Sequence, residues 1–119
     1  MTDESKKLLL DVKDAAAGVL QYTAGLTLER YAEWRLVRRA VEREFEIIGE
    51  ALNRLRRIDA ATAEQLPEAQ KIIAFRNRVI HGYDTVEDAI TWGIIEGKLP
   101  DLLSAVSRLL DDDDGSQNI

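Results

Sequence analysis

The most constraining feature of the sequence is its apolar periodicity, which follows the α-helix almost throughout. Apolar residues recur every three to four positions within residues 5–21, 34–57, 67–81 and 85–110, the spacing that builds one face of a helix. Strand-like alternation is absent from the sequence, and only two Pro and seven Gly interrupt it. The pattern therefore predicts an all-α protein, an up-and-down four-helix bundle with short connections.

Glycine and proline mark the expected helix ends. Gly25 ends the first helix, and a connector or short helical turn leads into the second. Pro67 suits the first turn of the third helix, and Gly82 suits its C-cap. Pro100 should kink or restart the fourth helix. Gly49 differs, because it lies inside the second helix and costs helix propensity there. We attribute it to the close approach of another helix.

The length of 119 residues predicts a single domain. We assign it to residues 1–110. Residues 111–119 form a tail with four Asp and no basic residue, which carries four of the six net negative charges. Such a charge run predicts a solvated, disordered end.

The composition also narrows the function classes. The chain has no Cys and one His, so disulfide and thiolate chemistry are excluded and a zinc site is disfavoured. We therefore expect no metal and no cofactor. No apolar run is long enough to cross a membrane, and the N-terminal stretch lacks the apolar core of a signal peptide. We expect no membrane association and a cytoplasmic location.

The charge of the chain bears on whether it binds nucleic acid. The net charge of −6 argues against a nucleic-acid binder, but Arg residues gather in residues 35–57. Glu residues interleave with them, so this region is either a solvated face with i,i+4 pairs or a local basic patch.

The apolar stripes, with Trp34 and Trp92, exceed what a small four-helix core needs. This excess favours a homodimer that buries one such face.

The third helix carries a charge in its apolar seam. At about 100° per residue, Arg76 falls within the arc set by Ile72, Phe75 and Ile80. A guanidinium there keeps its charge and needs partners. His81, the only histidine, is four residues from Asn77 and therefore its neighbour on a helix.

These residue types suit metal-free phosphodiester transfer. A histidine both accepts and donates protons near neutral pH, and a fixed Arg neutralises charge on phosphoryl oxygens. With one His per chain, a dimer would supply the second acid or base. Spacing alone leaves other readings open: Arg76 can pair with Glu46 or Glu50 inside the fold, and His81 can simply cap a helix.

Three segments resemble one family. The stretch "FRNRVIHGY" (residues 75–83) resembles the signature of HEPN-domain ribonucleases, and its final Gly-Tyr resembles the HepT-like branch. The stretches "VEREFEIIGEALNRL" (residues 41–55) and "TWGIIEGKLPDLL" (residues 91–103) resemble the long and final helices of that branch. The acidic tail is not part of these motifs, and Asp84 stands where the branch commonly has a bulky apolar or aromatic residue.

The resemblance implies a function and a set of site residues. It implies a HEPN-like helical homodimer that is the toxin of a toxin–antitoxin system and a metal-independent endoribonuclease. Arg76 and His81 would be the catalytic pair, and Asn77 a supporting residue. The antitoxin would be a minimal nucleotidyltransferase that transfers AMP onto Tyr83. The alternative is a non-catalytic dimeric partner of such a nucleotidyltransferase.

Overall fold

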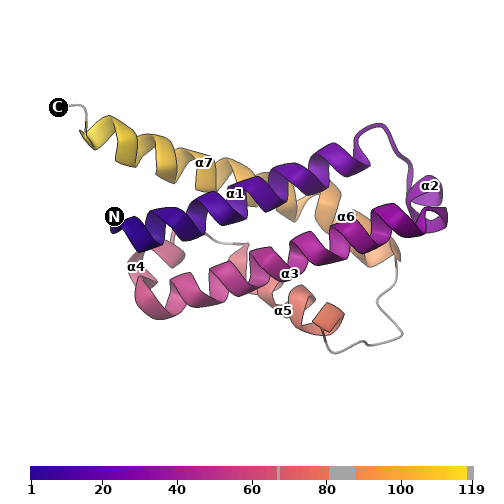
Figure 1. The fold of residues 1–119 in the computed structure, drawn as a ribbon, viewed down its shortest axis with the longest axis horizontal. Helices are drawn as coiled ribbons and strands as arrows, with labels where there is room; N and C mark the ends of the chain where they lie inside the picture. The colour runs from indigo at the N-terminus through magenta and orange to yellow at the C-terminus, as the bar shows by residue number, and fades with distance from the viewer. Residues whose placement is uncertain (67, 81–87, 118–119) are drawn as a thin grey trace.

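Helices make up most of the part of the chain that the computed structural model describes, residues 1–66, 68–80 and 88–117 (Figure 1). In chain order they are α1 (Asp3–Thr23), α2 (Leu28–Glu33), α3 (Arg35–Ile58), α4 (Ala60–Ala63), α5 (Ala69–Ile80), α6 (Asp88–Glu96) and α7 (Lys98–Gln117). These ranges contain no strand. The prediction of an all-α protein is confirmed.

The longer helices run antiparallel to their neighbours, as Figure 1 shows. Near the start of α1, Glu4 is 2.8 Å from Arg54 near the end of α3. Arg56 donates to Gln70 at the start of α5, with an N···O distance of 3.1 Å. The order α1, α3, α5 and α6–α7 therefore alternates up and down, as predicted.

Each long helix buries the apolar stripe that its sequence predicts. On α1 and α3 the fully buried side chains include Leu9, Val12, Val19, Val41, Phe45, Ile48, Leu52 and Leu55. Ile72 of α5 and Leu99, Leu102 and Val106 of α7 complete this core. Each fully buried Leu, Ile or Phe contributes about 1.5–3 kcal/mol relative to an exposed one, so the shared core holds the bundle together.

The first helix ends as its glycine predicts. Ala24 is the C-cap of α1, and Gly25 follows it with a φ of 76°. An L-residue other than glycine is strained in this left-handed region, which is why glycine commonly follows a helix. Thr27 then caps α2 by accepting from the backbone N–H of Arg30 at 3.2 Å. The turn lets the chain reverse into α2 and α3.

Two helices have boundaries that differ from the predicted ones. The expected start of the second helix at residue 34 is nearly right, and the preceding turn forms α2. The fourth helix is two helices, α6 and α7, separated at Gly97. Pro100 lies in the first turn of α7, where its missing N–H costs no helical hydrogen bond. Of the two predicted effects of Pro100, the restart is the one that the structure has. The predicted linker also contains the short helix α4.

The acidic tail differs from its prediction, because α7 continues through it to Gln117. Asp residues near a helix C-terminus oppose the helix dipole. Asp113, however, is 3.7 Å from the N-terminal ammonium group of Met1 and 4.0 Å from Lys6 Nζ. These cations offset the unfavourable dipole interaction and hold the end of α7 against the start of α1.

Within the described ranges, none of the helices has the length and apolar character needed to cross a membrane.

Candidate active site

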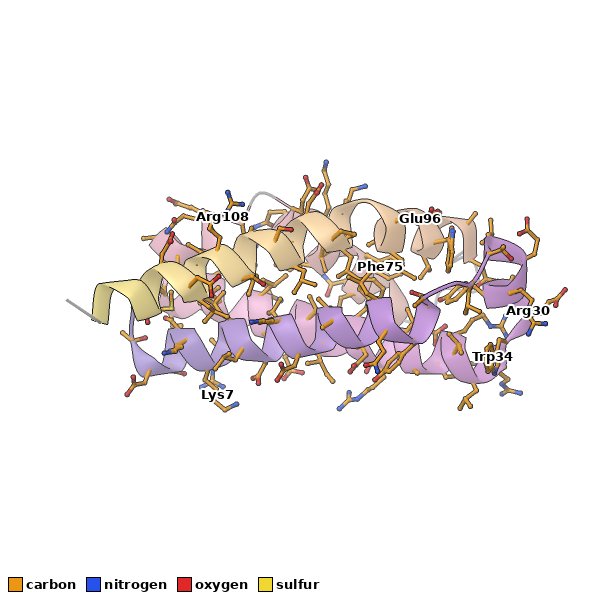
Figure 2. The ribbon with its side chains drawn as sticks, turned by 90° about the horizontal axis from the view of Figure 1, so that it is seen from above. Lys7, Arg30, Trp34, Phe75, Glu96 and Arg108 are labelled. Carbon is orange, nitrogen blue, oxygen red and sulfur yellow. The ribbon has the colours of Figure 1, made fainter. Side chains whose placement is uncertain are left out.

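Helix α5 carries the predicted site residues and packs on α3. Phe75 meets Phe45 of α3 edge to face, with ring centroids 4.9 Å apart and an interplanar angle of 78°. Ile72 and Ile73 are buried beside them. Figure 2 shows Phe75 among the side chains inside the bundle. This apolar contact fixes the face of α5 from which the next residue, Arg76, extends.

Arg76 crosses α3 at Gly49. A Cβ atom added to Gly49 would overlap Cβ and Cγ of Arg76 and would lie 2.9 Å from its Cδ. The prediction that Gly49 allows a helix to approach closely is therefore confirmed. The sequence signal was a glycine inside a helix, and the structure identifies the approaching group as the aliphatic stem of Arg76.

The guanidinium of Arg76 makes only some of its possible hydrogen bonds with the described residues. Its Nη1 donates to Asn77 Oδ1, with an N···O distance of 3.2 Å. Its Nε is buried and has no hydrogen-bond partner among the described residues. A buried donor without a partner is costly, and such groups concentrate where a ligand completes the arrangement. The structure thus brings Arg76 and Asn77 into contact and leaves the buried Nε–H without an acceptor among the described residues.

The alternative ion pair of Arg76 is not found among the described residues. Glu46 instead pairs with Arg43, at 3.1 Å. Glu50 is exposed and lines a groove between α1 and α3 together with Arg54. The charge in the seam is therefore not neutralised by Glu46 or Glu50, the two carboxylates that the sequence left open as its partners.

His81 and Tyr83 lie outside the described residues, as do Pro67, Gly82 and Asp84. In the sequence, His81 directly follows Ile80, the last residue of α5.

The start of α6 is anchored on α3. Arg38 Nη1 is 3.7 Å from Asp88 Oδ2, at the first position of α6, and also donates to the backbone carbonyl of Ala32 at 2.8 Å. Beside this contact, the rings of Tyr31 and Trp92 pack in a tilted arrangement, with centroids 5.4 Å apart and an interplanar angle of 41°. Burial raises the pKa of Tyr31, and the nearby Asp88 carboxylate raises it further. Helix α6 is thus linked to α3 by the Arg38–Asp88 ion pair and packs on α2 through Trp92.

A wide groove elsewhere in the molecule is a poor phosphate site. It lies between the start of α5 and helix α7, and carboxylates of Glu68, Asp101 and Asp112 line it beside Arg108. Its carboxylates would repel a phosphodiester backbone. No cluster of three or more potential metal ligands occurs in the described parts of the chain.

Comparison with known proteins identifies the family. Residues 12–109 match the family described as "Ribonuclease HepT-like". Among curated proteins, "Putative RNase MJ1380" of Methanocaldococcus jannaschii is 28% identical over 103 residues, 85% of this chain and 92% of that protein. "Putative RNase TTE0752" of Caldanaerobacter subterraneus subsp. tengcongensis is 28% identical over 92 residues, 77% of this chain and 81% of that protein.

A second protein of Methanocaldococcus jannaschii, "Putative RNase MJ0127", is 24% identical over 110 residues, 92% of this chain and 90% of that protein. No solved structure matches significantly. The family match spans α3, α5 and α6, and therefore includes Gly49, Arg76 and Asn77. The chain belongs to the HepT-like ribonuclease family.

Proposed function

We propose that the protein is a metal-independent endoribonuclease and the toxin of a toxin–antitoxin pair. The observation that carries the proposal is Arg76, whose guanidinium has a free buried donor and no carboxylate partner among the described residues. In a HepT-like chain this Arg precedes His81 by five residues, the spacing of the family motif. Arg76 as a whole is only partly buried, so the rest of its guanidinium is available to a phosphodiester oxygen.

The proposed chemistry uses the RNA itself as nucleophile. His81 removes the proton from a ribose 2′-hydroxyl, and the 2′-oxygen attacks the adjacent phosphorus. Arg76 stabilises the negative charge that builds on the phosphoryl oxygens. The bond to the 5′-oxygen then breaks, and that oxygen takes a proton from a second imidazole. The products are a 2′,3′-cyclic phosphate and a 5′-hydroxyl.

The second imidazole would come from a homodimer, because each chain has one His. Large apolar side chains at one end of the molecule support self-association. Trp34 is 44% exposed, Leu36 73% and Ile90 40%. Exposed apolar surface of this kind favours burial against another chain.

The partner in the proposal is a minimal nucleotidyltransferase antitoxin acting in the cytoplasm. It would transfer AMP from ATP to the Tyr83 hydroxyl, two residues after His81 in the sequence. An AMP group adds bulk and negative charge, which would repel the RNA phosphates and silence the nuclease.

The first test measures RNA cleavage in EDTA by the wild-type, Arg76→Ala and His81→Ala proteins. We expect cleavage by the wild type and losses of at least about a hundredfold in both variants. Cleavage by His81→Ala at the wild-type rate would reject the assignment. Tight binding of the nucleotidyltransferase, with no RNA cleavage and no toxicity in cells, would favour the non-catalytic partner instead.

The second test concerns Tyr83. Incubation with the nucleotidyltransferase, ATP and Mg²⁺ should increase the intact mass in steps of one AMP, and Tyr83→Phe should abolish the increase. The Mg²⁺ serves the partner's nucleotidyl transfer. Labelling that persists in Tyr83→Phe would assign the acceptor to another residue. Tyr22 is a suitable control, since it is an exposed phenol that already donates to Glu44 at 3.1 Å.

A further inference from the structure

Gly49 is unusual among the glycines of the described helices. It is buried in the middle of α3, and a Cβ there would overlap the stem of Arg76 at Cβ and Cγ, close to the α5 backbone. At Gly93 in α6, by contrast, an added Cβ meets no described atom within 4 Å. A helix-interior glycine costs stability relative to alanine. The contact with Arg76 explains why a glycine stands at position 49, and the described contacts give no such explanation for Gly93.

The contact at Gly49 has a consequence for the guanidinium. Because the aliphatic stem of Arg76 packs directly on α3, its Nε atom lies in a buried position. Asn77 Oδ1 accepts a hydrogen bond from Nη1. A long Arg side chain normally samples many rotamers. Here the contact with Gly49 on α3 and the hydrogen bond to the Asn77 amide restrict that freedom and orient the guanidinium before any substrate binds.

We propose that Gly49 is a positioning residue for the ribonuclease reaction: it admits the Arg76 stem against α3 and so aims the guanidinium at the scissile phosphate. This inference rests on the proposed function of Arg76. Gly49 itself touches no substrate and acts only through Arg76. Preorganised charge of this kind contributes to catalysis because the enzyme does not reorganise during the reaction.

The first experiment compares Gly49→Ala with Gly93→Ala as the matched control. A displacement of about 1 Å in a charge-stabilising group can cost about a hundredfold in rate. We expect Gly49→Ala to lower kcat by that order with little change in KM, because the lost interaction belongs to the transition state. Gly93→Ala should retain wild-type kinetics. A folded Gly49→Ala protein with wild-type kcat would overturn the inference.

A second experiment applies if Gly49→Ala does not fold. The double variant Gly49→Ala/Arg76→Gly exchanges the glycine between the helices and removes the overlap. It should melt at or above the temperature of Arg76→Gly alone. Propylguanidinium, which reproduces the missing side chain, should restore cleavage to Arg76→Gly. Propylguanidinium should not restore cleavage to the double variant, because the methyl group introduced at Gly49 occupies the space in which its propyl chain would lie. Equal rescue of both would overturn the inference.

A third measurement does not depend on activity. The ¹⁵N-labelled protein should show an Arg76 Nε–H resonance, identified by its loss in Arg76→Lys, that exchanges slowly with water because Nε is buried. Gly49→Ala should accelerate this exchange and Gly93→Ala should not. Unchanged exchange in Gly49→Ala would overturn the positioning role. If the wild type fails to cleave RNA while the exchange result holds, the proposed reaction fails and the positioning of Arg76 by Gly49 stands.

Discussion

Arg76 carries a structural cost for which its proposed function gives a reason. Its stem packs on Gly49, and its Nε is buried without a partner among the described residues. The carboxylate of Glu46, which could have neutralised it, is engaged with Arg43. An unpaired buried donor lowers stability. Residues that bind substrate commonly carry such a cost, and replacing them often stabilises the fold.

Replacing Arg76 with Met tests this cost. Met keeps an unbranched stem over Gly49 and removes the guanidinium. We expect the free energy of unfolding in urea to rise by about 1 kcal/mol, the lower end of the cost of an unsatisfied buried donor, while RNA cleavage is lost. Arg43→Met is the control, because it breaks an exposed pair that contributes about 1 kcal/mol or less. A loss of about 3 kcal/mol or more in Arg76→Met would instead indicate a buried ion pair.

At the scale of elements, Asp59 joins three helices. It is the N-cap of α4, accepting from the backbone N–H of Thr62 at 3.2 Å and from the Thr62 hydroxyl at 2.7 Å. It also accepts from the hydroxyl of Ser5 at 2.8 Å. Ser5 is fully buried in the first turn of α1. The carboxylate therefore ties the end of α3 and the start of α4 to α1.

These hydrogen bonds make stability depend on pH. The donors from Thr62, and then Ser5, lower the pKa of Asp59 below its ordinary value. The fold thus favours the ionised form, and this stabilisation is complete above the unfolded-state pKa. It is lost as the pH falls through the lowered folded-state pKa. Asp59→Asn should therefore show a smaller decrease in melting temperature on acidification than the wild type.

Asp59→Ala removes the cap at every pH. We expect a loss of about 1 kcal/mol at neutral pH, as for other N-caps. Identical pH slopes for the wild type and Asp59→Asn, measured by thermal unfolding in matched buffers, would show that Asp59 does not carry this dependence.

At the scale of the whole molecule, the start of the chain contacts the late part of α7. Asp113, late in α7, contacts the ammonium group of Met1 and the Lys6 side chain. The helix that carries the acidic run is therefore packed against the first helix of the bundle. The apolar side chains at the opposite end, Trp34 and Leu36, remain exposed in the single chain. Figure 2 shows Trp34 at that end, beside Arg30.

Mixed dimers test whether two histidines act in one site. If cleavage needs His81 from both chains, a dimer of one wild-type and one His81→Ala chain is inactive. After unfolding and refolding of an equal mixture, the activity should then be about a quarter of that of wild-type protein, the fraction of two-wild-type dimers in a C2 assembly. Light scattering should confirm two chains per particle. About half of the wild-type activity would mean that each chain acts alone.

The sequence by itself determined the helical class, the antiparallel order of the long helices and the need for a close helix contact at Gly49. These follow from local rules, because apolar spacing and helix-ending residues act within a few turns of the chain. The motif residues Arg76 and Asn77 could also be found this way. The continuation of α7 through the acidic run could not, since it depends on cations some hundred residues away in sequence.

Only the tertiary structure decided what surrounds Arg76. Spacing within one helix places Arg76 in the apolar seam but leaves both Glu46 and Glu50, on another helix, open as its partners. In the fold, Glu46 is held by Arg43, Glu50 faces the groove beside α1, and the stem of Arg76 occupies the space left by Gly49. The choice among these partners is made by how α5 packs on α3. Contacts between residues far apart in sequence therefore decide which groups surround the Arg76 side chain.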